Sequence, residues 1–162
     1  MLKNVSVKTW HAGQDPAWVL ATLTAVQHLG TNYEPWADYG VHQMIQNQVI
    51  DSYSIVYRDN EMIAGGGTRP GVAVPGIGQC YQIAVRGFRQ PQQGLRQDYF
   101  TLDTLVPLWV QAGRDLGYQH CVMTFNLHNE RLMKNLDRNW HYPRTVQGPH
   151  EVNGVSQWIY LF

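Results

Sequence analysis

Polar side chains suited to ligand binding first gather in the middle of this 162-residue sequence. An apolar stretch, Gln79–Val85, carries the polar side chains Tyr81 and Gln82. It runs into residues 86–97, which contain four Gln and three Arg. Arg pairs with phosphates and carboxylates through charge-assisted hydrogen bonds, so this segment is a candidate anion site.

A second polar group lies further along the chain. Residues 124–132 contain Asn126, Asn129 and Arg131. Asn is a preferred residue at a helix N-cap, so we expect Asn129 to begin a helix. No Ser-His-Asp or Cys-His arrangement with a recognisable local signature is present. The sequence therefore offers polar binding groups without a recognisable nucleophile.

Metal and disulfide chemistry are not indicated. The seven His residues show no His-x-x-x-His pattern with an acidic partner, so we expect no metal site. Cys80 and Cys121 each lie in an apolar, strand-like run, and we expect two buried free thiols.

Alternating and helical patterns of apolar residues predict the elements that must position these groups. Strands are expected at residues 3–10, 53–57, 61–67, 79–85, 120–125, 142–147 and 157–162. Helices are expected from Asp15-Pro16 to Gly30, and over residues 36–48, 98–116 and 129–138. Pro107 should kink the third helix or delay its start. Residues 70–78 should form a loop or an irregular strand, and a Gly/Pro-containing loop should join the last two strands.

The expected order of elements is β, α, α, β, β, β, α, β, α, β, β in a single domain, residues 1–162. A strand–loop–helix–strand unit over residues 79–125 normally gives parallel strands with a right-handed crossover. The flanking hairpins would make the sheet mixed. The three glycines at 65–67 suggest a bulge or a close approach of backbones.

This order resembles that of the GNAT family of acyl-CoA N-acyltransferases over roughly residues 3–162. In the family, the central strand leads into a loop of pattern Arg/Gln-x-x-Gly-x-Gly/Ala and then into a helix. Here Arg89 matches the first position and Gly94 the last, whereas Gln92 replaces the first Gly. Pro91 also removes one backbone donor from the loop.

The resemblance implies an α/β (α+β) fold with a central mixed sheet flanked by helices. It implies acetyl-CoA or another acyl-CoA as the co-substrate, with no metal. Backbone amides at a helix N-terminus would bind the pyrophosphate, and the central strand would diverge from the next one. The residues to which the resemblance assigns cofactor binding are Ile83, Ala84, Val85, Arg89, Gln90, Gln92, Gln93, Gly94, Leu95, Asn126, Asn129 and Arg131.

The catalytic groups are less clearly marked. The family often has a Tyr seven residues after the Asn of the second motif, acting as general acid, and Leu136 stands there instead. A general base must reach the amine proton directly or through one water, and the candidates are Tyr81, Gln82 and Glu61. Tyr33 and Trp36 lie where the family forms its acceptor pocket.

The leading hypothesis is an N-acyltransferase that moves an acetyl or other acyl group from acyl-CoA to a primary amine by direct attack. The acceptor would be a small molecule or a peptide. The main alternative is a catalytically inactive GNAT-fold protein with a structural or protein-binding role, for example in a virus particle. A third is a binder of another small ligand.

Composition narrows the partners. Basic and acidic residues are equal at twelve each, without the basic surplus of a general nucleic-acid binder. No apolar run approaches the ~20 residues of a membrane span, and the N-terminus lacks the apolar core of a signal peptide. We therefore expect no nucleic-acid partner, no membrane association and a cytoplasmic location. The resemblance also allows a homodimer.

Overall fold

A computed structural model describes residues 4–26, 38–88 and 99–162 of the chain. Its strands form one seven-stranded sheet in the order β1-β2-β3-β4-β5-β7-β6. The strands are β1 (Val5–His11), β2 (Ser52–Arg58), β3 (Glu61–Val74), β4 (Gly78–Gly87), β5 (Cys121–Asn126), β6 (Thr145–Val152) and β7 (Val155–Leu161). The α-helices are α1 (Ala17–Val26), α2 (Asp38–Gln46), α3 (Val106–Asp115) and α4 (Glu130–Asn139). The expected order of elements is confirmed.

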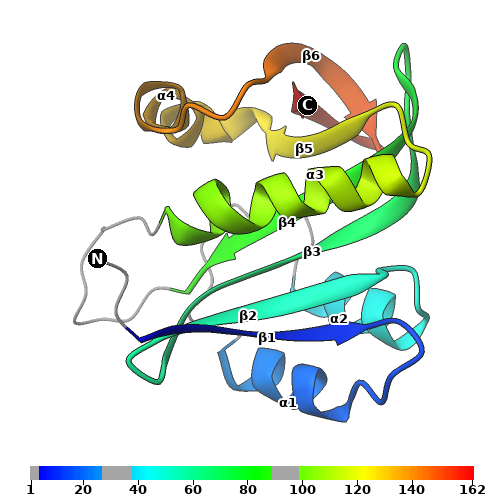
Figure 1. Cartoon of the computed structure of the whole chain (residues 1–162). Helices are drawn as coiled ribbons and strands as arrows, with labels where there is room; N and C mark the ends of the chain where they lie inside the picture. Colours follow the sequence, from blue (N-terminus) through cyan, green and yellow to red (C-terminus); the bar gives the residue numbers. More distant parts are fainter. Residues whose placement is uncertain (1–3, 27–37, 89–98) are drawn as a thin grey trace.

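The sheet is mixed, as predicted. Strands β4 and β5 run parallel, and every other neighbouring pair is antiparallel. Figure 1 shows α3 lying across the sheet between these two strands. This parallel pair with its helical crossover is the unit expected over residues 79–125.

Helices cover both faces of the sheet. On β4, the adjacent residues Ile83 and Ala84 point to opposite faces and join different core clusters. Ile83 packs with residues of α3 and α4, including Trp109 and Leu136. Ala84 packs with residues of α1 and α2, including Leu23. We call the face of the sheet that carries Ile83 the α3/α4 face, and the opposite face the α1/α2 face.

The helix boundaries follow from local chemistry. The Asp15 carboxylate accepts a hydrogen bond from the Ala17 amide at 3.0 Å, which confirms the predicted start of α1. Its predicted end at Gly30 lies outside the described residues. Before α3, residues Thr101–Leu105 form a π-helical turn in which the Val106 amide donates to the Thr101 carbonyl. Because Pro107 lacks an amide donor, the regular α-helix starts only at Val106, which is the delayed start that the proline predicts.

Residues 70–74 and 148–152, where loops were considered, belong to strands. Strand β3 continues to Val74 with an irregularity between Arg69 and Val72, so the irregular-strand alternative holds for residues 70–74, while residues 75–77 form a turn. The loop expected before the last strand was wrong. Strand β6 extends to Val152, with a register shift after Gln147, and turns through Asn153-Gly154 into β7. Asn-Gly is a strong hairpin signal that outweighs the Gly and Pro at positions 148 and 149.

The glycine run of β3 marks a close approach of backbones. A Cβ atom at Gly66 would lie 2.5 Å from the Ala84 carbonyl oxygen and 2.9 Å from the Trp109 ring. One at Gly67 would lie 2.3 Å from the Ser52 carbonyl oxygen. Residues 65–67 keep regular pairing with both neighbouring strands, so they form no bulge. Glycine here lets α3 lie close on the sheet.

Candidate active site

The central feature of the site is a fork between the parallel strands β4 and β5. The two strands pair at only two positions, Tyr81 with Cys121 and Gln82 with Val122. Beyond these pairs β4 continues to Gly87 and β5 to Asn126, and the two strands do not pair with each other again. Figure 1 shows the two arrows diverging from each other. The predicted divergence of the central strand, expected at residues 79–85, from the next strand is therefore present.

Backbone groups of β4 point into this fork. The Tyr81 amide donates to the His120 carbonyl at 2.9 Å, so Tyr81 directs its backbone groups towards β5. Strand alternation gives Ile83 and Val85 the same direction. Val85 has no β5 residue opposite it. A ligand lying along the fork can therefore hydrogen-bond to the edge of β4 as an added strand would.

Asn129 supplies an unpartnered amide on the β5 side of the fork. It occupies the N-cap position of α4, so the helix begins where predicted, although its side chain makes no capping hydrogen bond. The residue is 1% exposed, and neither amide atom has a hydrogen-bond partner among the described residues. Burying an unsatisfied amide is costly unless a ligand completes its hydrogen bonds.

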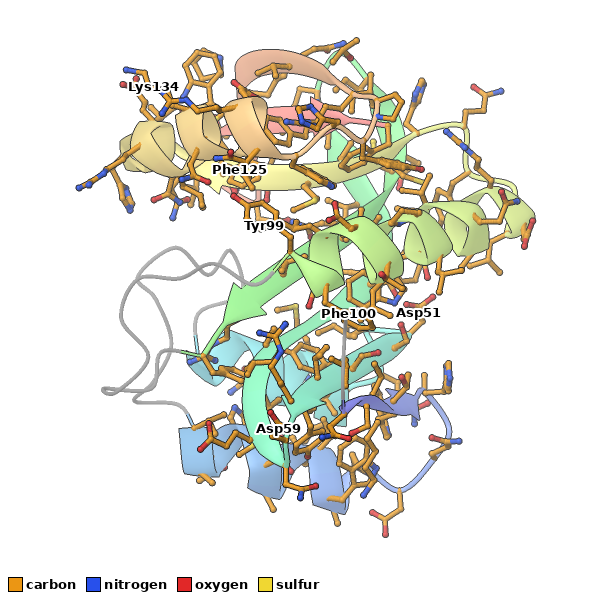
Figure 2. The ribbon with its side chains drawn as sticks, turned by 60° about the vertical axis from the view of Figure 1, so that its left-hand side comes forward. Asp51, Asp59, Tyr99, Phe100, Phe125 and Lys134 are labelled. Atoms are coloured by element: carbon orange, nitrogen blue, oxygen red, sulfur yellow. The ribbon has the colours of Figure 1, made fainter. Side chains whose placement is uncertain are left out.

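The mouth of the fork lies between the starts of α3 and α4. The Tyr99 hydroxyl donates to the Asn135 side-chain oxygen at 2.7 Å and links the segment before α3 to α4. Figure 2 shows Tyr99 and Phe125 in this region. The Thr101 hydroxyl, at the first position of the π-helical turn, is also buried without a hydrogen-bond partner among the described residues. The mouth thus combines apolar rings with polar groups that lack partners among the described residues.

Gln82 lies where the two strands part. It sits on the α1/α2 face of β4, since it alternates with Tyr81 and Ile83. Its side-chain nitrogen donates to the Thr124 hydroxyl of β5 at 3.0 Å. Gln82 and Thr124 are 2% and 3% exposed. This hydrogen bond joins Gln82, in the last pair of the two strands, to a β5 residue two positions beyond that pair. Neither side chain titrates near neutral pH.

Tyr81 points to the other face of the sheet. Its hydroxyl donates to the Asp51 carboxylate at 2.7 Å, and the Thr68 hydroxyl donates to the second oxygen of that carboxylate. Burial, followed by the contact with Asp51, raises the pKa of Tyr81 well above its usual range. The side chain therefore stays protonated and anchored in the core. The structure does not bring Tyr81 and Gln82 together on one face.

Glu61 lies far from these residues. It is exposed at the first position of β3, while Arg69 is the β3 residue that pairs with Gln82. Eight residues of extended chain separate the two positions, or about 26 Å. Of the other predicted site residues, Asn126 is half-buried at the end of β5 and Arg131 is exposed on α4.

Several predicted residues lie outside the described part of the chain. These are Tyr33 and Trp36 of the expected acceptor pocket and the loop residues Arg89, Gln90, Gln92, Gln93, Gly94 and Leu95. Leu136, which stands where the resemblance places a catalytic Tyr, is 2% exposed and packs in the core of the α3/α4 face. It supplies no proton to the fork.

Other possible sites are few. Cys80 and Cys121 are buried free thiols, as predicted.

Among the described residues, no group of three or more His, Cys, Asp or Glu could hold a metal ion. None of their helices is long and apolar enough to cross a membrane. A shallow hollow of about 800 Å³ lies against residues 73–79 of the β3–β4 hairpin, and its lining includes neither Gln82 nor Asn129.

Comparison with known proteins adds the fold family. No protein-family model matches the sequence, and no curated protein matches it significantly. Among solved structures, the aminoglycoside acetyltransferase AAC(6')-Ib in complex with coenzyme A and kanamycin is similar, with a TM-score of 0.60 and 13% identity. The match covers 98% of this chain and 94% of that one.

Two further structures are similar along most of their length. A GNAT family acetyltransferase from Brucella melitensis, in complex with acetyl-CoA, has a TM-score of 0.53 at 11% identity over 97% of this chain and 87% of its own. An agmatine N-acetyltransferase has a TM-score of 0.55 at 13% identity over 98% of this chain and 99% of its own. The likeness extends over the whole sheet, and the chain has the GNAT acyl-CoA N-acyltransferase fold.

Proposed function

We propose that this protein binds an acyl-CoA in the fork between β4 and β5 and transfers its acyl group to a primary amine. The observation that carries the proposal is the fork itself, with the unpartnered Asn129 amide on its β5 side. The three structures compared above are all named acetyltransferases, and two of them hold coenzyme A or acetyl-CoA. These likenesses support acyl transfer as the general chemistry.

The residues of the fork fit the arm of coenzyme A. That arm is an extended chain with two amide groups, so it can accept and donate hydrogen bonds along an open strand edge. Val85 offers backbone groups on one side, and Asn129 offers a side-chain amide on the other. An amide of this kind can donate to a carbonyl and accept from an N–H at the same time. Arg89 to Gly94 would bind the phosphates.

The chemistry is a direct acyl transfer. Acyl-CoA supplies an activated thioester, whose carbonyl carbon the amine nitrogen attacks. A C–N bond forms, the C–S bond breaks, and the sulfur leaves as a thiolate that takes up the proton lost by the amine. This chain contributes mainly by holding both reactants in place and by offering strand amides to the developing negative charge. The amine must arrive uncharged, since neither Gln82 nor Thr124 is a base.

Calorimetric titration with coenzyme A and with acetyl-CoA tests the binding step. We expect saturable binding of both ligands, weakened at least about tenfold in Asn129→Leu, since one or two hydrogen bonds are lost. Gln111→Leu, on the exposed side of α3, is a control that should bind normally. Absence of binding at millimolar ligand would refute the proposal.

A non-catalytic role remains the second candidate. It is favoured by one observation, the buried Leu136 in the place of a catalytic Tyr. An assay of thiol release with a broad panel of amines separates the two. Tight acetyl-CoA binding with no turnover for any amine would favour the non-catalytic role.

A further inference from the structure

The α1/α2 face of the fork carries positive charge. Arg69 on β3 pairs directly with Gln82, and paired residues of antiparallel strands share a face. Arg69 therefore lies one strand away from the point where β4 and β5 part, about 5 Å in backbone spacing. Arg86 follows on the same face of β4, is 2% exposed, and lies 5.4 Å from the centre of the Phe88 ring.

Arg69 is poorly satisfied within the chain. Its one hydrogen-bond partner among the described residues is the Met44 sulfur of α2, at 3.6 Å. A thioether is a weak acceptor, whereas a guanidinium offers five N–H donors. The contrast with Arg144 is clear, because that guanidinium contacts Asp137 at 3.3 Å and three backbone carbonyls. Arg69 is half-buried, and most of its donors have no partner within the described part of the chain.

Among the described residues, no hydrogen bond or ion pair joins Arg69 to a carboxylate. Strands β4, β5 and β7 contain no acidic residue. Glu151 of β6 pairs with Ser156 and so faces away from Gln157, which shares the face of Thr124 and Gln82. Asp51 contacts Tyr81 on the opposite face. A polycationic amine would meet repulsion here.

We propose that the acceptor is a primary amine that also carries a carboxylate, and that Arg69 binds this carboxylate. The inference rests on the proposed acyl transfer, since it places the acceptor on the α1/α2 face of the same fork. A guanidinium binds a carboxylate through two parallel hydrogen bonds, which fixes the orientation of the acceptor as well as its charge. Amino acids and acidic peptides belong to this class of acceptor.

The test compares matched acceptors in an acetyl-CoA assay. Each of a series of amino acids and longer amino-carboxylic acids is measured against its own carboxamide, and against a diamine of similar length. We expect at least about a tenfold higher kcat/KM for the best acid than for its amide, the effect of one charge-assisted pair. Arg69→Gln should lower the value for the acid to that for the amide. Arg69→Lys should restore part of the difference.

Controls separate this inference from the proposed function. Arg138→Gln, an exposed arginine on α4, should leave the preference unchanged, and Arg69→Gln should bind acetyl-CoA as the unaltered protein does. If acetyl-CoA binds but acids have no advantage, or if the advantage survives in Arg69→Gln, the inference is wrong while the proposed function stands. If acetyl-CoA does not bind, both fail. If acetyl-CoA binds but no amine is acylated, binding of amino-carboxylic acids to the coenzyme A complex is measured instead. Binding that is lost in Arg69→Gln supports the inference, and absence of such binding refutes it.

Discussion

Asn129 has a cost in the free protein that should be measurable. Its two amide atoms are buried without partners among the described residues, and each such group costs about 1–3 kcal/mol. Asn129→Leu keeps the branched shape of the side chain and removes the polar atoms, so we expect it to raise the unfolding free energy by about 1 kcal/mol. Thermal unfolding without ligand should show a Tm higher by about 2–4 °C.

The same substitution should have the opposite effect when ligand is present. Coenzyme A should raise the Tm of the unaltered protein more than that of Asn129→Leu, because only the first can complete the amide's hydrogen bonds. Tm values of both proteins, measured with and without coenzyme A, would show whether the ligand-induced rise in Tm is smaller in Asn129→Leu. A variant that is less stable in both conditions would instead assign Asn129 a purely structural role.

Cys80 should make the protein sensitive to alkali. Burial, and then the neighbouring Cys121, raises the pKa of this thiol from 9.0 to about 11. Between these values the unfolded chain has lost the proton and the folded chain has kept it. The unfolding free energy therefore falls as pH rises from about 9 to about 11, by up to about 1.4 kcal/mol per pH unit.

Urea unfolding from about pH 8 to about pH 10.5 checks this slope. Cys80→Ala should be less stable at every pH, because it leaves a cavity, but its stability should fall less steeply. The pKa of Tyr81 is also raised, chiefly by burial, so some slope should remain in the variant. A slope identical in the two proteins would contradict the prediction.

Strand β3 should tolerate no side chain where α3 crosses it. At Gly66 a Cβ atom would press against both the Ala84 carbonyl and the Trp109 ring, so Gly66→Ala should destabilise the fold by about 1–3 kcal/mol. Gly87 on β4 has nothing within 4 Å of its added Cβ, so Gly87→Ala is a matched control within about 0.5 kcal/mol of the original. Denaturant midpoints measure both. Equal effects would show that α3 can shift away.

The elements themselves could be predicted where apolar spacing was regular. The helical spacing of Leu102, Leu105 and Trp109 predicted a helix in the region of α3. The position of Pro107 predicted the delayed start of that helix. The length of β6 was missed because Gly148-Pro149 indicates a loop locally, while pairing with β7 holds the segment as a strand. Tertiary pairing of this kind leaves little mark in a single segment.

The site could be predicted only in part. Asn129 was identified through its motif, but its role as an unsatisfied buried amide needs the packed structure. Arg69 was not identified, because its importance depends on Gln82 and Met44, which are distant in the sequence. The anchoring of Tyr81 by Asp51, 30 residues away, was likewise out of reach. Spacing along one strand could not tell which of Tyr81 and Gln82 lies on the α1/α2 face.

The chain as a whole should unfold as one unit, as the single domain proposed for residues 1–162 requires. At about 0.7 kcal/mol per residue, a calorimetric enthalpy of about 110 kcal/mol is expected near the midpoint. It should equal the van't Hoff value. Coenzyme A at one hundred times its Kd should add about 2.7 kcal/mol. Two separate transitions would show that the parts on either side of the fork unfold independently.

That outcome is a real alternative because of the fork. Strands β1–β4 and β5–β7 form two half-sheets whose backbone pairing with each other is limited to two positions, Tyr81 with Cys121 and Gln82 with Val122. A ligand held by Val85 on one side and Asn129 on the other would supply rungs that the chain lacks. The proposed co-substrate would then be a structural member of the sheet, and its departure after each turnover would remove backbone pairing between the two half-sheets.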